Sequence, residues 1–107
     1  MSRFADVLAR LSETIAARKA ADASASYTAQ LLADPARAAK KLGEEAIETV
    51  IAALGADKDA LAAESADLLY HWLVVLAAAG VSLEDVAAKL EAREGTSGLA
   101  EKAGRQP

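Results

Sequence analysis

The 107-residue sequence predicts an all-α fold, a bundle of about four to five helices that is completed by dimerisation. Three observations support this class. Alanine is abundant while aromatic residues make up 4% of the chain, apolar residues recur at spacings of three and four, and Gly, Pro, Ser and Asp stand where helices would begin and end. No segment shows the alternation typical of a strand. We expect one domain over residues 1–94 and a mobile tail over residues 95–107.

An apolar stripe marks the first helix. Its members recur at helical spacing: Phe4, Val7, Leu8, Leu11 and Ile15. The small and polar side chains of residues 20–27 then predict a loop.

Capping residues delimit two central helices. Asp34 followed by Pro35 is typical of an N-cap with proline at the first helical position, and Gly55 is placed to stop that helix. Asp57 can cap the next helix and Gly80 can end it. The short turn between the two helices predicts that they run antiparallel.

A shorter helix is predicted after the central pair. Ser82 with Asp85 resembles an acidic variant of the capping box, and Gly95 is placed to close the helix. The remaining residues, GTSGLAEKAGRQP, form the expected tail.

Composition excludes several kinds of site and partner. Without cysteine the chain cannot carry a disulfide, a thiolate zinc site or a cysteine nucleophile, and we expect a reducing, cytoplasmic home. A formal net charge of −4 gives no general attraction to nucleic acid. The amino-terminal residues alternate charged and apolar side chains, unlike a secretory signal. The longest apolar run, residues 68–80, is too short to span a membrane. We therefore expect no nucleic-acid and no membrane partner.

The two central helices carry one pair of acids each. Glu45 and Glu48 are three residues apart, as are Glu64 and Asp67, so each pair projects from one side of its helix. In an antiparallel hairpin the pairs can face each other, and four like charges then repel unless their pKa values rise or a cation neutralises them. Carboxylate ligands favour a hard cation such as Mg²⁺ or Mn²⁺, and Mg²⁺ commonly binds phosphates as well. A nucleotide is therefore the natural substrate class.

Helical projection separates the faces of these helices. In the first, Lys41 shares the face of the acid pair, and Glu44 lies between that face and an apolar stripe. The members of the stripe are Ile47, Val50, Ile51 and Leu54. In the second helix apolar residues between 68 and 76 cover nearly the whole circumference, so this helix should be central and buried.

Each of these residues could also have a purely structural role. One acid pair on a helix is usually a solvated surface, whereas two pairs, the second leading into an apolar helix, favour a site. His71 alone is expected to be a packed or hydrogen-bonded core residue rather than a metal ligand. Aromatic residues such as Tyr27 and Trp72 are more often packing residues than platforms for a bound base, and Lys40 and Lys41 would ordinarily be exposed charges.

The acid pairs and their neighbours resemble a known signature. ExxE followed by ExxD is similar to the metal-binding motif of the all-helical nucleoside triphosphate pyrophosphohydrolases, which include MazG-type enzymes and dimeric dUTPases. Within this group the sequence resembles the phosphoribosyl-ATP pyrophosphatase family. Five segments, in the family's order, carry the resemblance: SYTAQLL (26–32), KKLGEEAIE (40–48), ESADLLYHWLVVL (64–76), GVSLEDV (80–86) and GTSGLAEKAGR (95–105). The loop before SYT departs from the family, which often has more proline or glycine there.

The resemblance implies a fold and an activity. Members are helical oligomers, usually homodimers, and they hydrolyse phosphoribosyl-ATP to phosphoribosyl-AMP and pyrophosphate in the second step of histidine biosynthesis. By resemblance Glu45, Glu48, Glu64 and Asp67 coordinate Mg²⁺, with Mn²⁺ as a possible substitute, and the metal bridges the triphosphate. No covalent nucleophile is needed.

Further residues receive roles as hypotheses. The proton acceptor for the attacking water is Glu45 or Glu48, with Glu44 in reserve. Four basic residues are expected to hold phosphates: Lys40, Lys41, Lys102 and Arg105. Three hydroxyl side chains are expected to bind the ribose-phosphate end of the substrate: Ser26, Tyr27 and Thr28.

Two alternatives remain open from sequence. A MazG-type housekeeping pyrophosphohydrolase would use the same carboxylates on ordinary or damaged nucleoside triphosphates. A non-catalytic helical dimerisation module would bind no divalent cation. A ferritin-like di-iron site is disfavoured because neither acid pair ends in histidine.

Overall fold

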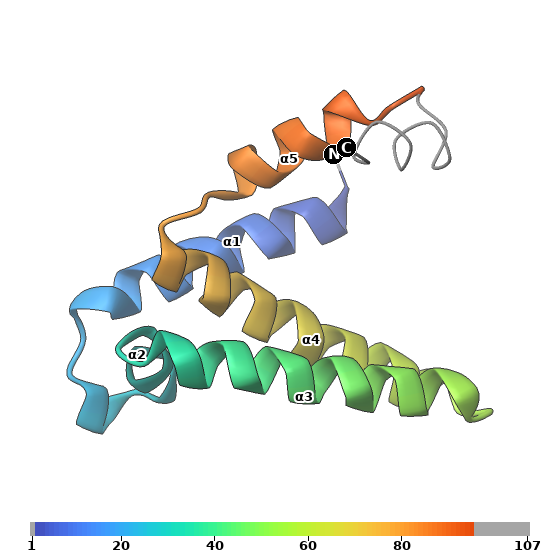
Figure 1. The fold of residues 1–107 in the computed structure, drawn as a ribbon, viewed down its shortest axis with the longest axis horizontal. Helices are drawn as coiled ribbons and strands as arrows, with labels where there is room; N and C mark the ends of the chain where they lie inside the picture. The colour runs from blue at the N-terminus through green and yellow to red at the C-terminus, as the bar shows by residue number, and fades with distance from the viewer. Residues whose placement is uncertain (1, 96–107) are drawn as a thin grey trace, which may run out of the picture.

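The computed structural model describes residues 2–95 of the chain. Within that range it has five α-helices, two short 3₁₀ helices and no strand (Figure 1), which confirms the all-α class. In chain order the elements are α1 (Arg3–Ala17), η1 (Arg18–Ala20), η2 (Ala23–Ala25), α2 (Tyr27–Leu32), α3 (Pro35–Leu54), α4 (Lys58–Ala79) and α5 (Leu83–Ala92). The predicted tail beyond Gly95 lies outside the described residues.

The predicted helix starts are confirmed by their hydrogen bonds. The Asp34 carboxylate accepts a backbone N–H at 3.2 Å, and Pro35 is the first residue of α3. Asp57 accepts two backbone N–H groups at the start of α4. At α5 the Ser82 hydroxyl accepts from the Asp85 N–H at 3.0 Å, while the Asp85 carboxylate accepts from the Ser82 N–H at 2.9 Å. These contacts form the complete capping box, which satisfies N–H groups that the helix itself cannot pair.

The glycines end their helices in different ways. Gly80 has φ 75° and ψ 24°, the left-handed conformation that costs glycine little. Gly55 is extended, with φ −79° and ψ 174°, so it ends α3 as predicted but without the left-handed turn of a usual C′ glycine. The helix α5 ends at Ala92, earlier than the predicted stop at Gly95, which has φ 78°.

The connection between α1 and α3 is more ordered than the predicted loop. Residues 20–27 include the end of η1, all of η2 and the first residue of α2. Asp22 caps η2 by accepting the Ser24 N–H at 2.9 Å, and the Ser26 hydroxyl caps α2 by accepting the Ala29 N–H at 3.2 Å. The six residues of α2 are too few to show a periodic apolar stripe, so periodicity did not predict this helix.

The fold is centred on an antiparallel hairpin of α3 and α4, which make the most extensive contact between elements (Figure 1). Both α1 and α2 pack on α4, and α2 also packs on α3. The buried core lies where these helices meet and consists of Ile15, Leu31, Ala38, Leu73 and Val74. Leu73 and Val74 confirm α4 as the central helix. Its other large apolar residues between 68 and 76 are only half buried, so the predicted burial of the whole helix is not reached in this structure.

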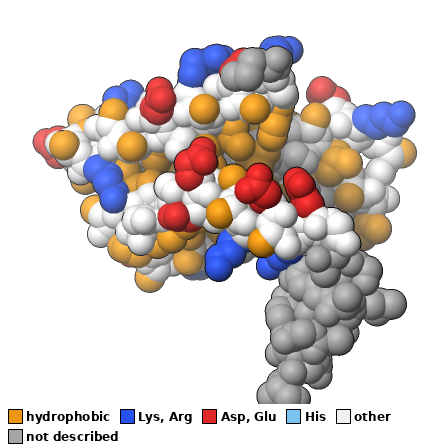
Figure 2. Space-filling view, turned by 90° about the horizontal axis from the view of Figure 1, so that it is seen from above, with side chains coloured by type: hydrophobic (Ala, Val, Ile, Leu, Met, Phe, Trp, Pro, Cys, Tyr) orange, Lys and Arg blue, Asp and Glu red, His pale blue; other side chains and the backbone are white. Residues whose placement is uncertain are grey.

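The predicted apolar stripe of α3 is present but exposed. Ile47, Val50, Ile51 and Leu54 keep 62%, 59%, 59% and 85% of their surface accessible. Hydrophobic patches also interrupt the polar surface on the face seen in Figure 2. The stripe points away from α4, because Ile51 follows the half-buried Thr49 by two residues, a rotation of about 200° on an α-helix. Within the described part of the chain, α3 therefore keeps a continuous apolar face that no other element covers.

The helix α4 is longer than the apolar run read from the sequence. It has 22 residues, and by length and composition alone it could cross a membrane. Core helices of soluble proteins meet the same criterion. In this fold α4 supplies two core residues and contacts α1, α2 and α3, as a core helix does.

Candidate metal and active site

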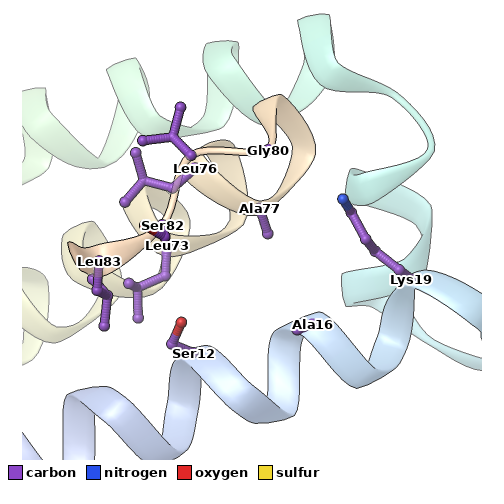
Figure 3. Close-up of a pocket in the computed structure, with 10 residues that line it drawn as sticks. Ser12, Ala16, Lys19, Leu73, Leu76, Ala77, Gly80, Ser82 and Leu83 are labelled. Atoms are coloured by element: carbon purple, nitrogen blue, oxygen red, sulfur yellow. The ribbon is translucent and has the colours of Figure 1, made fainter. Parts of the chain in front are cut away.

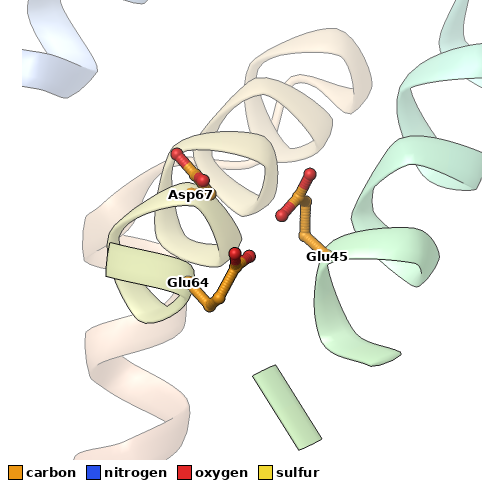
Figure 4. A group of neighbouring side chains, drawn as sticks. All are labelled: Glu45, Glu64 and Asp67. Carbon is orange, nitrogen blue, oxygen red and sulfur yellow. The ribbon is translucent and has the colours of Figure 1, made fainter. Parts of the chain in front are cut away.

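Three of the four predicted acids converge between α3 and α4. Glu45 projects from α3, while Glu64 and Asp67 project from α4, and Figure 4 shows Glu45 and Glu64 pointing toward each other with Asp67 beside them. One carboxylate oxygen from each residue lies within 4.8 Å of the other two. The antiparallel hairpin brings them together, because it places the middle of α3 beside the middle of α4. Glu48, one turn after Glu45 and exposed, is not in this group.

The donor set suits a hard divalent cation. Mg²⁺ binds oxygen ligands at about 2.0–2.1 Å in an octahedron, so opposite ligands are about 4.2 Å apart. Three ligands include at most one opposite pair, and neighbouring octahedral ligands are only about 3 Å apart. The three oxygens lie within 4.8 Å of one another, so the side chains would have to rotate inward to share one ion. Three carboxylates leave other positions of an octahedron for water and phosphate oxygens, which is how Mg²⁺ is commonly held.

Electrostatic repulsion acts within the acid group. Desolvation raises the pKa of Glu64, and the negative charges of Glu45, Asp67 and Glu48 raise it further. A hydrogen bond with Glu45 that favours the protonated form acts in the same direction. Glu48 therefore lies near enough for its charge to raise the pKa of Glu64, although it is outside the three-residue group. A bound cation would relieve this repulsion.

The two predicted phosphate-binding lysines lie on different sides of α3. Lys41 is one turn before Glu45, and its Nζ lies 3.4 Å from Glu44 Oε1. Lys40 is exposed and is rotated by about 100° from Lys41, toward the apolar stripe. Lys41 is therefore on the acid side of the helix and Lys40 is not. The other two predicted phosphate ligands, Lys102 and Arg105, lie outside the described residues.

The predicted ribose-phosphate ligands lie at the start of α2. The Ser26 hydroxyl caps α2, as described above, and the Thr28 hydroxyl is hydrogen-bonded to the Tyr70 hydroxyl of α4 at 2.5 Å. Tyr27 is 45% exposed, with the Arg37 guanidinium 5.8 Å from its ring centroid. The bond between Thr28 and Tyr70 fixes this segment to α4 three residues beyond Asp67, whereas Tyr27 remains available to a ligand.

His71 is a core residue, as expected. It is 8% exposed, and its Nδ1 lies 2.9 Å from the Asp67 carbonyl oxygen. Since a carbonyl can only accept, Nδ1 carries the proton in this bond. The Tyr70 ring packs edge-on against the imidazole, with centroids 4.9 Å apart. Trp72 also packs against the core, in line with its expected packing role.

A separate pocket of about 280 Å³ lies between α1 and the turn from α4 to α5. Figure 3 shows Ser12 and Ala16 of α1 facing Leu73, Ala77 and the residues of that turn. No carboxylate is among the described residues that line it. This pocket is therefore distinct from the acid group.

Two polar residues near the acids were missed by sequence reasoning. The Thr49 hydroxyl lies between the backbones of α3 and α4, and Tyr70 binds Thr28. Both contacts depend on which turns of different helices lie side by side, which a single sequence does not state. The only available signal was their position: Thr49 is one turn after Glu45, and Tyr70 lies between Asp67 and the core.

Comparison with known proteins identifies the family of this chain. The sequence profile of the phosphoribosyl-ATP pyrophosphohydrolase family matches residues 8–94. The chain belongs to that family. Proteins named phosphoribosyl-ATP pyrophosphatase are similar over nearly the full length: 73% identical over 96% of both chains in Caulobacter vibrioides strain NA1000 / CB15N, and 60% identical over 98% of this chain and 97% of the relative in Parvibaculum lavamentivorans. The region of this chain that matches the family, residues 8–94, includes both acid pairs.

Proposed function

We propose that this chain hydrolyses phosphoribosyl-ATP between its α- and β-phosphates, giving phosphoribosyl-AMP and pyrophosphate in the second step of histidine biosynthesis. The convergence of Glu45, Glu64 and Asp67 within 4.8 Å, in a member of this family, carries the proposal. The names of the similar proteins support the choice of substrate.

Mg²⁺ is the proposed cofactor, and Mn²⁺ could replace it. Glu45, Glu64 and Asp67 would hold the ion, with Glu48 as a further ligand or as the proton acceptor. When bound, the ion supplies positive charge that offsets the triphosphate and polarises the attacking water. The repulsion that raises the pKa of Glu64 supports a cation at this position.

Glu48 is the best placed of the three proposed proton acceptors. Glu45 belongs to the converging group, and Glu44 is paired with Lys41 at 3.4 Å. Glu48 is exposed, lies one turn from Glu45 and acts electrostatically on Glu64. It can therefore take a proton from water attacking the phosphorus while the other acids remain ligands.

Substrate contacts are proposed on the same side of the hairpin. Lys41 would meet phosphate oxygens at one end of the acid group, and Tyr27 would offer an exposed hydroxyl and ring at the start of α2. Lys40 points toward the apolar stripe, so it would serve only a site to which a second copy of the chain contributes.

The protein is proposed to act as a homodimer, with a second copy covering the apolar stripe of α3. Four neighbouring aliphatic side chains at 59–85% exposure form an unusually apolar face for one helix. Only six hydrophobic residues in the described part of the chain are buried. The radius of gyration, 16.0 Å, exceeds the roughly 13 Å typical of a compact 100-residue domain. A second protomer would supply the missing cover.

The proposed setting is the cytoplasm, with a small-molecule substrate and without nucleic-acid or membrane partners. The net charge of −4 and the absence of cysteine support this setting.

Pyrophosphate release tests the proposed function. The purified protein should release pyrophosphate from phosphoribosyl-ATP only when Mg²⁺ is present, and it should leave a panel of ordinary triphosphates, including dCTP and dUTP, nearly untouched. Release from ordinary triphosphates alone would assign the site to a housekeeping pyrophosphohydrolase. No release from any substrate would favour a non-catalytic helical module.

A further inference from the structure

Thr49 links the two helices that carry the acid group. Its Oγ1 lies 2.8 Å from the Glu45 carbonyl oxygen on α3 and 3.3 Å from the Glu64 carbonyl oxygen on α4. The hydroxyl has one proton, so its hydrogen bond is divided between the two carbonyl oxygens, and the longer bond, to Glu64, is the weaker one. The bond to Glu45 is the ordinary backward bond of a helical threonine. The bond to Glu64 crosses to the other helix, and both acceptors belong to proposed metal ligands.

Although α3 and α4 make the most extensive contact in the fold, the α3 side of that contact is formed mostly by small or polar residues. The α3 residues that face α4 recur at spacings of four and three and are buried or half buried: Ala38, Leu42, Glu45, Thr49 and Ala52. Only Leu42 among them is a large apolar side chain. The bulky residues Ile47, Val50 and Ile51 point away from α4.

Repulsion acts at the same place. Glu45 and Glu64 carry like charges, and in the absence of a cation this repulsion favours separation of the helices. Thr49 opposes that separation with a polar contact one turn from Glu45. A metal site requires its ligands to be held within about 0.5 Å of the productive geometry, so a small displacement of one helix would weaken cation binding.

We propose that Thr49 is a positioning residue of the metal site: its hydroxyl holds the backbones of Glu45 and Glu64 at the spacing that lets their carboxylates and Asp67 converge on one cation. This inference rests on the proposed function, because it assigns a role at the same site. Thr49 touches neither the cation nor the substrate and acts through the residues that do.

Two substitutions separate the hydroxyl from the shape of the side chain. Thr49→Val keeps the branched shape and removes the hydroxyl, while Thr49→Ser keeps the hydroxyl. A matched control is Thr14→Val on α1, because Thr14 Oγ1 donates only to the Arg10 carbonyl of its own helix, at 3.0 Å. Thr14→Val loses the same local bond without touching the hairpin.

The test is calorimetric titration with Mn²⁺ and with Mg²⁺ on the full chain without substrate, beside the Mg²⁺ dependence of pyrophosphate release. Loss of a group that orients metal ligands typically costs about 10- to 100-fold in affinity. Thr49→Val should therefore bind each cation about tenfold more weakly and require correspondingly more Mg²⁺ for half-maximal turnover. Thr49→Ser and Thr14→Val should stay within about threefold of the parent. Helix content by circular dichroism should be the same in all four proteins.

The outcomes distinguish this inference from the proposed function. Equal cation affinity in Thr49→Val and the parent would overturn the positioning role, as would an equal loss in the Ser and Val variants. A parent chain that binds neither cation would overturn it too. If the parent binds cations and Thr49→Val binds them weakly, but phosphoribosyl-ATP is not hydrolysed, the positioning role stands and the proposed function fails.

Discussion

Replacing Ile51 by Glu is expected to dissociate the proposed homodimer. Ile51 lies in the exposed stripe of α3 and keeps 59% of its surface accessible in one protomer. Full burial of an isoleucine side chain contributes roughly 1.5–3 kcal/mol, so covering this fraction contributes about 1–2 kcal/mol per copy and about 2–4 kcal/mol per dimer. At about 1.4 kcal/mol for each tenfold, the dissociation constant should rise roughly 30- to 700-fold. Burying two carboxylates in an apolar interface would raise it further.

Sedimentation equilibrium over a concentration series measures this constant. The matched control is Ala53→Glu, which adds the same charge to an exposed position of α3 that is turned by about 200° from Ile51. The control should change the dissociation constant by less than about threefold. A dimer of unchanged affinity in Ile51→Glu would refute the assignment of the interface to this stripe, and a parent chain that is monomeric throughout would refute dimerisation itself.

Three other substitutions test the site and the fold. Glu48→Gln should reduce pyrophosphate release at least about 100-fold, as loss of a general base does, without changing helix content or dimerisation; near-parental turnover would reject the role. Glu64→Gln should abolish turnover yet raise the melting temperature of the metal-free protein at neutral pH. The folded-state pKa of Glu64 is raised, so its ionised form destabilises the fold above that pKa, and the gain should shrink as the pH falls through it; a gain that does not depend on pH would contradict this. Ser82→Ala removes one half of the capping box and should cost about 1 kcal/mol of unfolding free energy, measured at fixed protein concentration; an unchanged melting temperature would show that the cap is dispensable.

Local interactions were the predictable part of this structure. Asp34 and Ser82 cap their helices through bonds to N–H groups three residues away, so their roles depend only on neighbours in the sequence. The meeting of Glu45 with Glu64 and Asp67 also followed from the sequence, because a short turn forces antiparallel helices and the two acid pairs are the right distance from it.

The remaining features depend on contacts that one sequence does not state. Periodicity located the stripe at Ile47 but could not say whether α4 or a second chain covers it. Thr49 reads as an ordinary helical residue until the register between α3 and α4 is known. Gly55 and Gly80 both end helices, yet only Gly80 adopts the left-handed conformation, because the path of the following chain decides the choice.

The two opposite faces of α3 limit how the length of this chain can vary. The residues that meet α4 and the stripe from Ile47 to Leu54 alternate along the same three turns. Inserting one residue at Ala46 would rotate every later position by about 100° relative to Glu45. Thr49 would then no longer face α4, and the apolar stripe would point in a different direction. A seven-residue insertion would leave a rotation of only about 20°. Differences in length among related sequences should therefore fall in the connection before α2 or after α5, and the central hairpin should keep its length.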